Sequence, residues 1–344
     1  MPFNPVLVIA KVEKPEWYKA TARFAQADNL IAIRQLLTTL VPYLILMALM
    51  FRIVNIYPYW FTLALSVVAA AFFARMFILF HDCTHGSLLS SPRWNRNIGY
   101  LCGILTFTAF HDWRRSHAGH HITAGDLDRR GMGDITTMTV DEYLSAKSLQ
   151  KLAYRLYRHP IILLGIGPLY YFLLRNRYPS PGAKKIDFAS VILTDLALVA
   201  IWVTAGLTIG LRTYIMVQLP VLTTAATLGI WLFYNQHQFE GVYWARHEEW
   251  DPWRVAMEGA SYYCLPRLLQ WVTGNIGFHH VHHMRPGIPN YRLQECYEAI
   301  PELQAVPPLT VRKSLGSLRL NLYDESQRRL VSFKSLKNKS VNRR

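Results

Sequence analysis

Three short stretches hold most of the histidines of this chain, at spacings that suit a shared metal ion. The chain contains thirteen histidines in 344 residues. The stretch "HDCTH" places two of them four residues apart, and "HAGHH" and "HHVHH" each contain the spacing H-x-x-H-H. The histidines concerned are His81, His85, His117, His120, His121, His279, His282 and His283. Because residues three and four apart share one face of a helix, each stretch predicts imidazoles on a single helical face, and His81 and His85 can share a metal ion.

The number of these imidazoles predicts two metal ions. An isolated histidine is usually an ordinary polar group, but eight in three clusters favour metal binding. Imidazole nitrogen binds zinc, copper, iron and nickel alike, and a tetrahedral zinc takes four ligands, or three and a water. An imidazole-rich pair with open positions suits iron and dioxygen, although the spacing alone leaves a dizinc centre open. The four cysteines form no C-x-x-C pair and predict neither a disulfide framework nor a thiolate site.

Membrane helices are the elements that the composition predicts to carry these clusters. The chain is 51% hydrophobic and only 17% charged, whereas an ordinary soluble domain has about 25% charged residues. Four apolar runs approach the roughly 20 residues needed to cross a bilayer. We place them at about residues 33–54, 57–80, 188–211 and 213–236, as two hairpins. Two shorter apolar stretches, 98–110 and 160–174, are expected to lie at the interface or dip partway into the membrane.

The charge distribution predicts which side of the membrane holds the histidines. The formal net charge of +15 lies in the terminal segments and between the apolar runs, which indicates contact with anionic lipid or an acidic partner. Nucleic acid is the weaker explanation, because no binding-module signature accompanies the charge. The basic N-terminal segment lacks a cleavable signal and is expected in the cytoplasm, with only Arg52 and Arg212 at the opposite turns. All three histidine clusters then face the cytoplasm.

The three histidine clusters resemble the histidine boxes of the membrane-bound fatty acid desaturases, in which a pair of membrane spans also separates the second box from the third. The stretches "GDLDRRGMGDITTMTVDEY", "NQHQFEGVYWARHEEWD" and "LQWVTGNIGFHHVHHMRPGIPNYRL" are similar to bacterial acyl-lipid omega-6, or delta-12, desaturases. The resemblance covers about residues 80–324. It implies an all-α integral membrane protein of the bacterial inner membrane, in which four transmembrane helices and interfacial helices carry a cytoplasmic cap with a di-iron site. We expect one domain over residues 1–344, with a cap from 81–187 and 237–330 and a basic tail at about 331–344.

The resemblance also implies a ninth iron ligand at the end of the fourth span, where "YNQHQFE" supplies His237. The family pattern in the third box leaves His280 outside the ligand set. The expected catalytic and metal-binding residues are His81, His85, His117, His120, His121, His237, His279, His282 and His283.

Four further residues are candidates to support these ligands. Relatives have an asparagine that reaches iron through water, but this chain has Phe233 at that spacing, so Asn235 and Asn275 are possible substitutes. Asp82 and Asp112 each follow a histidine and are candidates to accept an imidazole N–H. Helix capping or a surface contact is the alternative for both aspartates. The three histidines at 111, 159 and 247 fit no ligand spacing and are expected to be ordinary interfacial residues.

The implied reaction is the oxygen-dependent introduction of a cis double bond into an acyl chain of a membrane lipid, with oleoyl to linoleoyl as the expected conversion. The implied cofactors are two iron ions, with O2 as co-substrate. Electrons must come from ferredoxin or a cytochrome b5-like donor. The chain has no "HPGG" signature of a fused cytochrome b5, and its cysteine spacing fits no iron-sulfur cluster.

Three other functions share part of this pattern. Alkane or carotenoid hydroxylases and ketolases have similar boxes and would insert oxygen. A zinc protease is suggested by the likeness of "HDCTH" to H-E-x-x-H, but Asp82 replaces the glutamate base. A metal transporter would place its site near the bilayer midplane, whereas these clusters lie at or beyond the ends of the predicted spans.

Asp195 lies within a span, where an ionisable residue is a functional candidate unless it pairs with a neighbouring segment.

Overall fold

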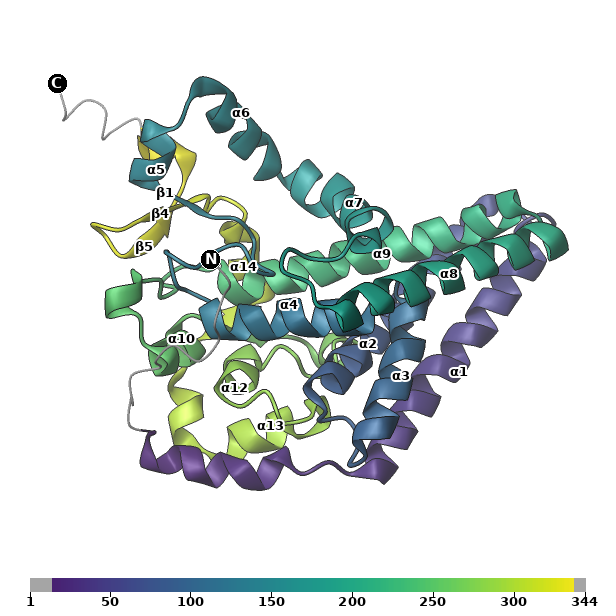
Figure 1. Cartoon of the computed structure of the whole chain (residues 1–344), viewed down its shortest axis with the longest axis horizontal. Coiled ribbons are helices and arrows are strands. Elements are labelled where there is room, and N and C mark those ends of the chain that lie inside the picture. Colours follow the sequence, from purple (N-terminus) through teal and green to yellow (C-terminus); the bar gives the residue numbers. More distant parts are fainter. Residues whose placement is uncertain (1–13, 337–344) are drawn as a thin grey trace.

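Four long helices dominate the computed structural model, which describes residues 14–336. They are α1 (Asn29–Ile53), α2 (Tyr59–His85), α8 (Lys185–Thr208) and α9 (Leu211–His237). Each is long and apolar enough to cross a membrane, with mean hydropathy between 1.6 and 2.3. Their outer ends extend together to one side, and the remaining elements gather around the opposite ends (Figure 1). The predicted all-α fold with four membrane-spanning helices is therefore confirmed.

Helix α2 is the centre of this bundle. It packs against α1, α9 and α3 (Pro92–Leu105). In its most apolar window 56% of the residues are buried, against 28% in α1 and in α8. The helix runs five residues beyond the predicted span end at 80 and stops where Gly86 adopts a φ of 71°, a left-handed conformation that favours glycine. This extension carries both histidines of the first box out of the apolar bundle on one continuous helix.

Shorter helices fill the space between the spans and the cap. After α3 the chain turns at Phe107 and enters α4 (Phe110–Thr123), which packs against α8. The two short apolar stretches expected near the interface fall in α3 with its turn, and in a π-helix (Ile162–Ile166) continued by α7 (Gly167–Leu173). Their depth relative to a bilayer stays a prediction.

The carboxylate of Asp195 forms an ion pair within the bundle. Its Oδ1 lies 2.5 Å from Arg177 Nη1, in the short turn before α8. The second guanidinium nitrogen of Arg177 donates to the carbonyl of Phe107 at 2.5 Å. Asp195 therefore pairs with a neighbouring segment, which was the alternative to a functional role for this residue.

The cap is built from short helices and two small sheets. Its helices are α5 (Val140–Ser145), α6 (Ser148–Tyr157), α10 (Pro252–Glu258), α11 (Arg267–Val272), α12 (His279–Met284), α13 (Asn290–Ala299) and α14 (Val311–Ser317). Strand β4 (Leu322–Asp324) pairs in parallel with β1 (Met138–Thr139) and antiparallel with β5 (Arg329–Val331). Strand β2 (Tyr262–Cys264) pairs in parallel with β3 (Pro308–Thr310). The cap thus joins segments from both halves of the chain.

The C-terminal boundary differs from the prediction. Charged and apolar residues at 309–330 have roughly helical spacing, but only α14 is helical and the segment continues as β4 and β5. Leu322 and Val331 are buried against the Val140 and Tyr143 side chains, which explains why the chain is extended there. The first residues of the segment 331–344, expected to be a basic tail, include the end of β5 and a 3-10 helix (Phe333–Ser335), and residues 337–344 lie outside the described part.

Candidate metal centre

Four helices bring all nine expected histidines together. Helix α2 supplies His81 and His85 from its last two turns, and α9 supplies His237 as its last residue. Helix α4 supplies three imidazoles and so does the six-residue helix α12, at His117, His120, His121, His279, His282 and His283. Their ring nitrogens form two compact groups, in each of which the candidate ligand atoms lie within 4.8 Å of one another.

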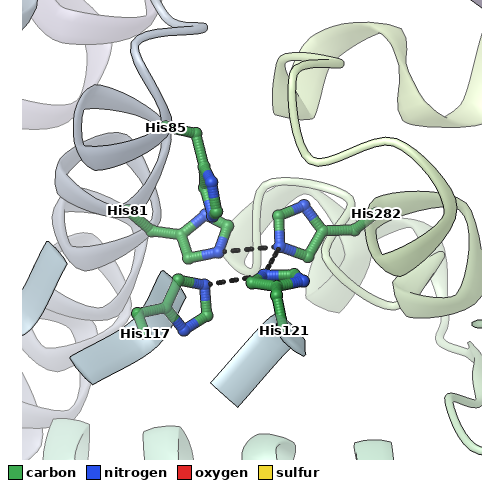
Figure 2. A group of neighbouring side chains, drawn as sticks. All are labelled: His81, His85, His117, His121 and His282. Carbon is green, nitrogen blue, oxygen red and sulfur yellow. Dashed lines mark hydrogen bonds between the residues drawn. The ribbon is translucent and has the colours of Figure 1, made fainter. Parts of the chain in front are cut away.

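The first group contains five imidazoles, His81, His85, His117, His121 and His282. Figure 2 shows how these rings from α2, α4 and α12 converge on one point. His282 Nε2 lies 3.1 Å from His81 Nε2 and 3.0 Å from His121 Nε2, which lies 3.1 Å from His117 Nε2. Two nitrogens bound to one ion at about 2.0–2.1 Å lie roughly 3 Å apart, so these separations suit a common ion.

The second group contains four imidazoles, His120, His237, His279 and His283. His237 Nε2 lies 3.0 Å from both His120 Nε2 and His279 Nε2. Helices α4 and α12 contribute to both groups, whereas α2 contributes only to the first and α9 only to the second. The two groups are therefore neighbours built on shared helices.

The donor atoms suit metal ions chemically. His85 Nε2 and His283 Nε2 are buried and have no hydrogen-bond partner, an arrangement that costs free energy unless another ligand is bound. Burial, reinforced by the neighbouring imidazoles, lowers the pKa of five histidines of α4 and α12 well below the ordinary value of histidine. These are His117, His121, His279, His282 and His283. Neutral imidazole is the form that binds a metal. The residues present therefore fit two ions.

In three imidazoles, those of His81, His237 and His120, the Nδ1 atom has a hydrogen-bond partner outside the group. Asp82 Oδ1 lies 3.2 Å from His81 Nδ1 in the first group, while Asp82 Oδ2 accepts from the backbone and side-chain N–H groups of Asn290, at 2.6 and 2.8 Å. In the second group, His237 Nδ1 lies 3.0 Å from the carbonyl oxygen of Gly259. Such partners fix which nitrogen carries the proton and leave Nε2 for a metal.

Asp134 is a supporting residue that the sequence interpretation missed. Its Oδ1 lies 2.6 Å from His120 Nδ1, in the second group. The aspartate lies in the loop "GMGDI", fourteen residues after its histidine, where no periodic spacing marks it. Gly133 has a φ of 73°, and a Cβ atom there would lie 3.3 Å from His120 Cβ. Gly133 was the available signal, because a glycine there allows the loop backbone to approach His120 of α4 closely.

The other supporting candidates lie elsewhere. Asp112 accepts hydrogen bonds from the Ser180 backbone at 2.9 Å and from the Ser180 hydroxyl at 2.6 Å, so it fixes the loop before α8 and orients no histidine. Asn235 donates to the Trp231 carbonyl within α9, and its Oδ1 is buried without a partner. Asn275 donates to the Asn290 carbonyl at 3.2 Å. Neither amide hydrogen-bonds to the nine histidines, and a water-mediated role for them stays a prediction.

An aromatic ring occupies the position at which the family resemblance implies an asparagine. The Phe233 ring centroid lies 5.3 Å from that of His120 and 5.6 Å from that of His237. The second group is therefore walled by an apolar side chain on the α9 side.

The remaining four histidines lie outside both groups, as expected. His280 Nε2 lies 3.1 Å from the Leu303 carbonyl oxygen, and burial lowers the pKa of His280 to about 4. His247 Nδ1 lies 2.8 Å from Asp126 Oδ2. His111 packs against the Tyr100 ring, and His159 Nδ1 accepts from the Ile161 backbone.

Comparison with known proteins points to one enzyme family. The family model described as "Fatty acid desaturase" matches residues 58–312. A fatty acid desaturase of Bacillus subtilis (strain 168) is 44% identical over 319 residues, which is 93% of this chain and 90% of the relative. An endoplasmic-reticulum omega-3 fatty acid desaturase of Vigna radiata var. radiata is 25% identical, over 86% of this chain and 76% of its own length. A temperature-sensitive sn-2 acyl-lipid omega-3 desaturase (ferredoxin) of Arabidopsis thaliana is 27% identical, over 70% of this chain and 55% of its own length.

Proposed function

The chain belongs to the fatty acid desaturase family, and from this premise we propose that it converts oleoyl chains of membrane lipids into linoleoyl chains by delta-12 desaturation. As a member of that family it is an oxidoreductase, and its four apolar helices make it a membrane protein. The observation that carries the proposal is the pair of buried imidazole groups at the ends of α2 and α9. The delta-12 position rests on the likeness of the three longer stretches to omega-6 desaturases.

Two iron ions are the proposed cofactors. The first would be held by the group around His282 and the second by the group around His237. When bound, iron supplies with dioxygen the oxidising chemistry that removes hydrogen from two adjacent unactivated methylenes, which no acid or base of the chain could do. The relatives described above are desaturases by name, which favours desaturation over a peptidase or a transport function.

The side chains of the protein prepare the site for this chemistry. Asp82, Asp134 and the Gly259 carbonyl hold the Nδ1 protons of three imidazoles, so that their Nε2 atoms face the two groups. His81 and His120, which both contact a carboxylate, are 4% and 1% exposed, so water is largely excluded from them. The supporting groups thereby fix the ligand geometry before substrate arrives.

An external protein must supply electrons. Desaturation consumes one O2, two electrons and two protons for each double bond, and it releases two waters. The cysteines at 83, 102, 264 and 296 are too far apart in the sequence to suggest a redox cluster. We propose ferredoxin as the donor, because the Arabidopsis relative carries that donor in its name. A cytochrome b5-like protein is the alternative.

The proposed orientation places the site in the bacterial cytoplasm. Both imidazole groups lie at the ends of α2 and α9 that are opposite to the hairpin turns carrying Arg52 and Arg212. The basic N-terminal segment precedes α1 and so approaches the membrane on the same side as the imidazoles. The positive-inside rule then assigns that side to the cytoplasm.

The test is the fatty-acid profile, with double-bond positions, of oleate-fed cells that express the protein with a ferredoxin and its reductase. His282→Ala removes a member of the first group, whereas His280→Ala, in the same helix, removes an imidazole that belongs to neither group. We expect a delta-12 diene from the unaltered protein and from His280→Ala, and none from His282→Ala. A hydroxylated fatty acid without a diene would instead identify a hydroxylase, and a diene at another position would refute the delta-12 assignment.

A further inference from the structure

Two exposed arginines lie on adjoining faces of α3 and α4, which pack against each other. Arg96 is on the face of α3 that also carries Tyr100, four residues later. Arg114 is on the face of α4 that carries His111, three residues earlier. The ring centroids of Tyr100 and His111 are 5.7 Å apart, so the two faces meet at these rings. We call the guanidinium groups of Arg96 and Arg114 the basic patch.

The charges of both arginines act on the His111 ring. Burial lowers the pKa of His111, and the charges of Arg114 and Arg96 lower it further, whereas the carboxylate of Asp187 raises it. Both guanidinium groups therefore lie near one imidazole, which belongs to neither metal-binding group.

The carboxylates of this region are paired with a different arginine. Arg115 Nε lies 2.8 Å from Asp187 Oδ2, and Arg115 Nη2 lies 3.4 Å from Asp112 Oδ1. Within residues 14–336, Arg96 and Arg114 have neither an ion pair nor a side-chain hydrogen bond. The basic patch thus keeps two positive charges that no carboxylate of the described chain neutralises, and this favours an anionic ligand.

The basic patch lies at the level where the membrane-spanning helices meet the cap. Helix α8 begins at Lys185 and packs against both α3 and α4. Figure 1 shows α3 between the cap helices α12 and α13 and the outer ends of the long helices. Trp94 and Leu101 of α3 and Phe188 in the first turn of α8 are exposed. Exposed aromatic and aliphatic side chains beside basic residues are typical of the boundary between lipid headgroups and acyl chains.

We propose that the basic patch is a binding site for the phosphate of a membrane phospholipid. A phosphodiester supplies the negative charge that the patch lacks, and guanidinium groups bind phosphate oxygens through paired N–H donors. A soluble acidic protein would match the charge alone, whereas a phospholipid matches both the charge and the apolar side chains around it. Arg114 precedes His117 by three residues on α4, so the site lies about one helical turn along α4 from the first imidazole group. Lipid binding here requires no assumption about the reaction.

Glutamine removes each charge and is compatible with an exposed helical position. Arg96→Gln, Arg114→Gln and the double variant Arg96→Gln/Arg114→Gln therefore test the site, while Arg96→Lys/Arg114→Lys keeps both charges. Arg329→Gln is the matched control for one lost charge. This arginine is exposed in β5, which lies at the end of the cap away from the membrane helices (Figure 1).

The test is native mass spectrometry of the full chain in detergent, titrated with dioleoylphosphatidylglycerol. We expect each single glutamine substitution to weaken lipid binding roughly fivefold, which corresponds to about 1 kcal/mol for one basic residue near anionic lipid. The double glutamine variant should bind more weakly still, and the double lysine variant should bind more tightly than the double glutamine variant. Arg329→Gln should match the unaltered protein. Dioleoylglycerol, which has the same acyl chains and no phosphate, should bind weakly and equally to all variants.

Four results would overturn the proposal. The first is equal binding of phosphatidylglycerol by the double glutamine variant and the unaltered protein. The second is equally weak binding by the lysine and glutamine variants, which would attribute the loss to the fold and not to the charges. Displacement of the lipid by inorganic phosphate at equal concentration would identify a site for free phosphate. Loss of ferredoxin binding without loss of lipid binding would identify a docking surface for the electron donor.

Discussion

The nine histidines differ in the hydrogen-bond partner of the ring nitrogen that faces away from the metal-binding groups. His81 and His120 each contact a carboxylate, one in each group, through Asp82 and Asp134. His237 contacts a backbone carbonyl. A carboxylate makes the imidazole more electron-rich and more firmly oriented than a neutral acceptor does. Each group thus contains one imidazole that is a stronger donor than its neighbours.

Asp134→Asn tests this role in the second group. The substitution keeps the size of the side chain but replaces the negative charge 2.6 Å from His120 Nδ1. We expect iron affinity at the second group to fall roughly 10–100-fold, the usual effect of removing such a partner, while the thermal unfolding temperature changes little. Iron titration followed by Mössbauer spectroscopy would measure the loss.

Asp112→Asn is the control for that substitution, because its carboxylate contacts Ser180 and no histidine. Its iron affinity should equal that of the unaltered protein. Equal affinity in Asp134→Asn as well would show that the carboxylate has no part in holding the metal.

The limits of prediction at this scale are clearest in the tripeptide "FHD", which occurs twice. In residues 80–82 its aspartate contacts the preceding imidazole, whereas in residues 110–112 it contacts the loop before α8. The local sequence is the same, and only the neighbouring segments distinguish the two roles. Eight histidines could be selected by spacing because each set lies on one helix, but Asp134 reaches its partner across a loop and has no such pattern.

At the scale of the helices, Arg75 connects three elements near the centre of the bundle. It is 4% exposed within α2, and its Nε donates to the Thr39 hydroxyl of α1 at 3.2 Å. Its Nη1 donates to the Trp271 carbonyl at the end of α11, and the guanidinium carbon lies 4.3 Å from the Trp271 ring centroid. It forms no ion pair within residues 14–336. Backbone and hydroxyl oxygens therefore take the place of a counter-ion.

Arg75→Leu should weaken the packing of α2 against α1 and α11. The change removes the donor to the Thr39 hydroxyl and one of the donors to the Trp271 carbonyl, which also accepts from the Gly274 backbone. Hydrogen bonds to a charged group contribute about 1.5–3 kcal/mol each, so we expect a fall in the free energy of unfolding. Thermal unfolding in detergent would measure it. Arg34→Leu, which removes an exposed arginine from α1, should have little effect. If the two variants were equally stable, the contacts of Arg75 would not support the bundle.

The presence of four long apolar helices could be predicted, because hydropathy alone decides it. The ends of helices could not be predicted where hydropathy and another force act on the same residues. Helix α2 continues beyond its apolar run to His85, because helical hydrogen bonding continues until Gly86 allows the chain to turn. The segment after α14 has charges at nearly helical spacing, yet the burial of Leu322 and Val331 in a small sheet decides its conformation.

In the molecule as a whole, the imidazoles link segments that lie far apart in the chain. The first group joins α2 and α4 to α12, and the second joins α4 to α9 and α12. Metal binding to such a folded site stabilises it by mass action, by about 2.7 kcal/mol at a free concentration 100 times the dissociation constant.

Removal of iron with a chelator should therefore lower the thermal unfolding temperature, and restored iron should raise it again in a concentration-dependent way. His282→Ala should show a smaller increase, since its first group is incomplete, whereas His280→Ala should respond like the unaltered protein. Unfolding temperatures that do not depend on iron would contradict a structural link through the metals.

The orientation in the membrane can be tested with a native thiol. Within the described residues, Cys264 is the exposed cysteine of the cap, and the other three are buried. A membrane-impermeant maleimide should label it in inside-out bacterial vesicles and leave it unlabelled in intact cells. Arg212→Cys, at the turn between α8 and α9, should give the opposite result. Labelling of Cys264 from outside the cell would reverse the proposed orientation.

The order of the helices along the chain has a consequence for biosynthesis. Helix α12 completes both groups and is the last of the four ligand helices to leave the ribosome. The hairpin of α1 and α2 is inserted into the membrane long before His282 and His283 are synthesised. During that time His81 and His85 are present in the nascent protein without the imidazoles of α12. Both proposed iron sites are therefore complete only after translation has passed residue 283. Cells that produce the protein faster than iron is delivered should accumulate a fully inserted but inactive form.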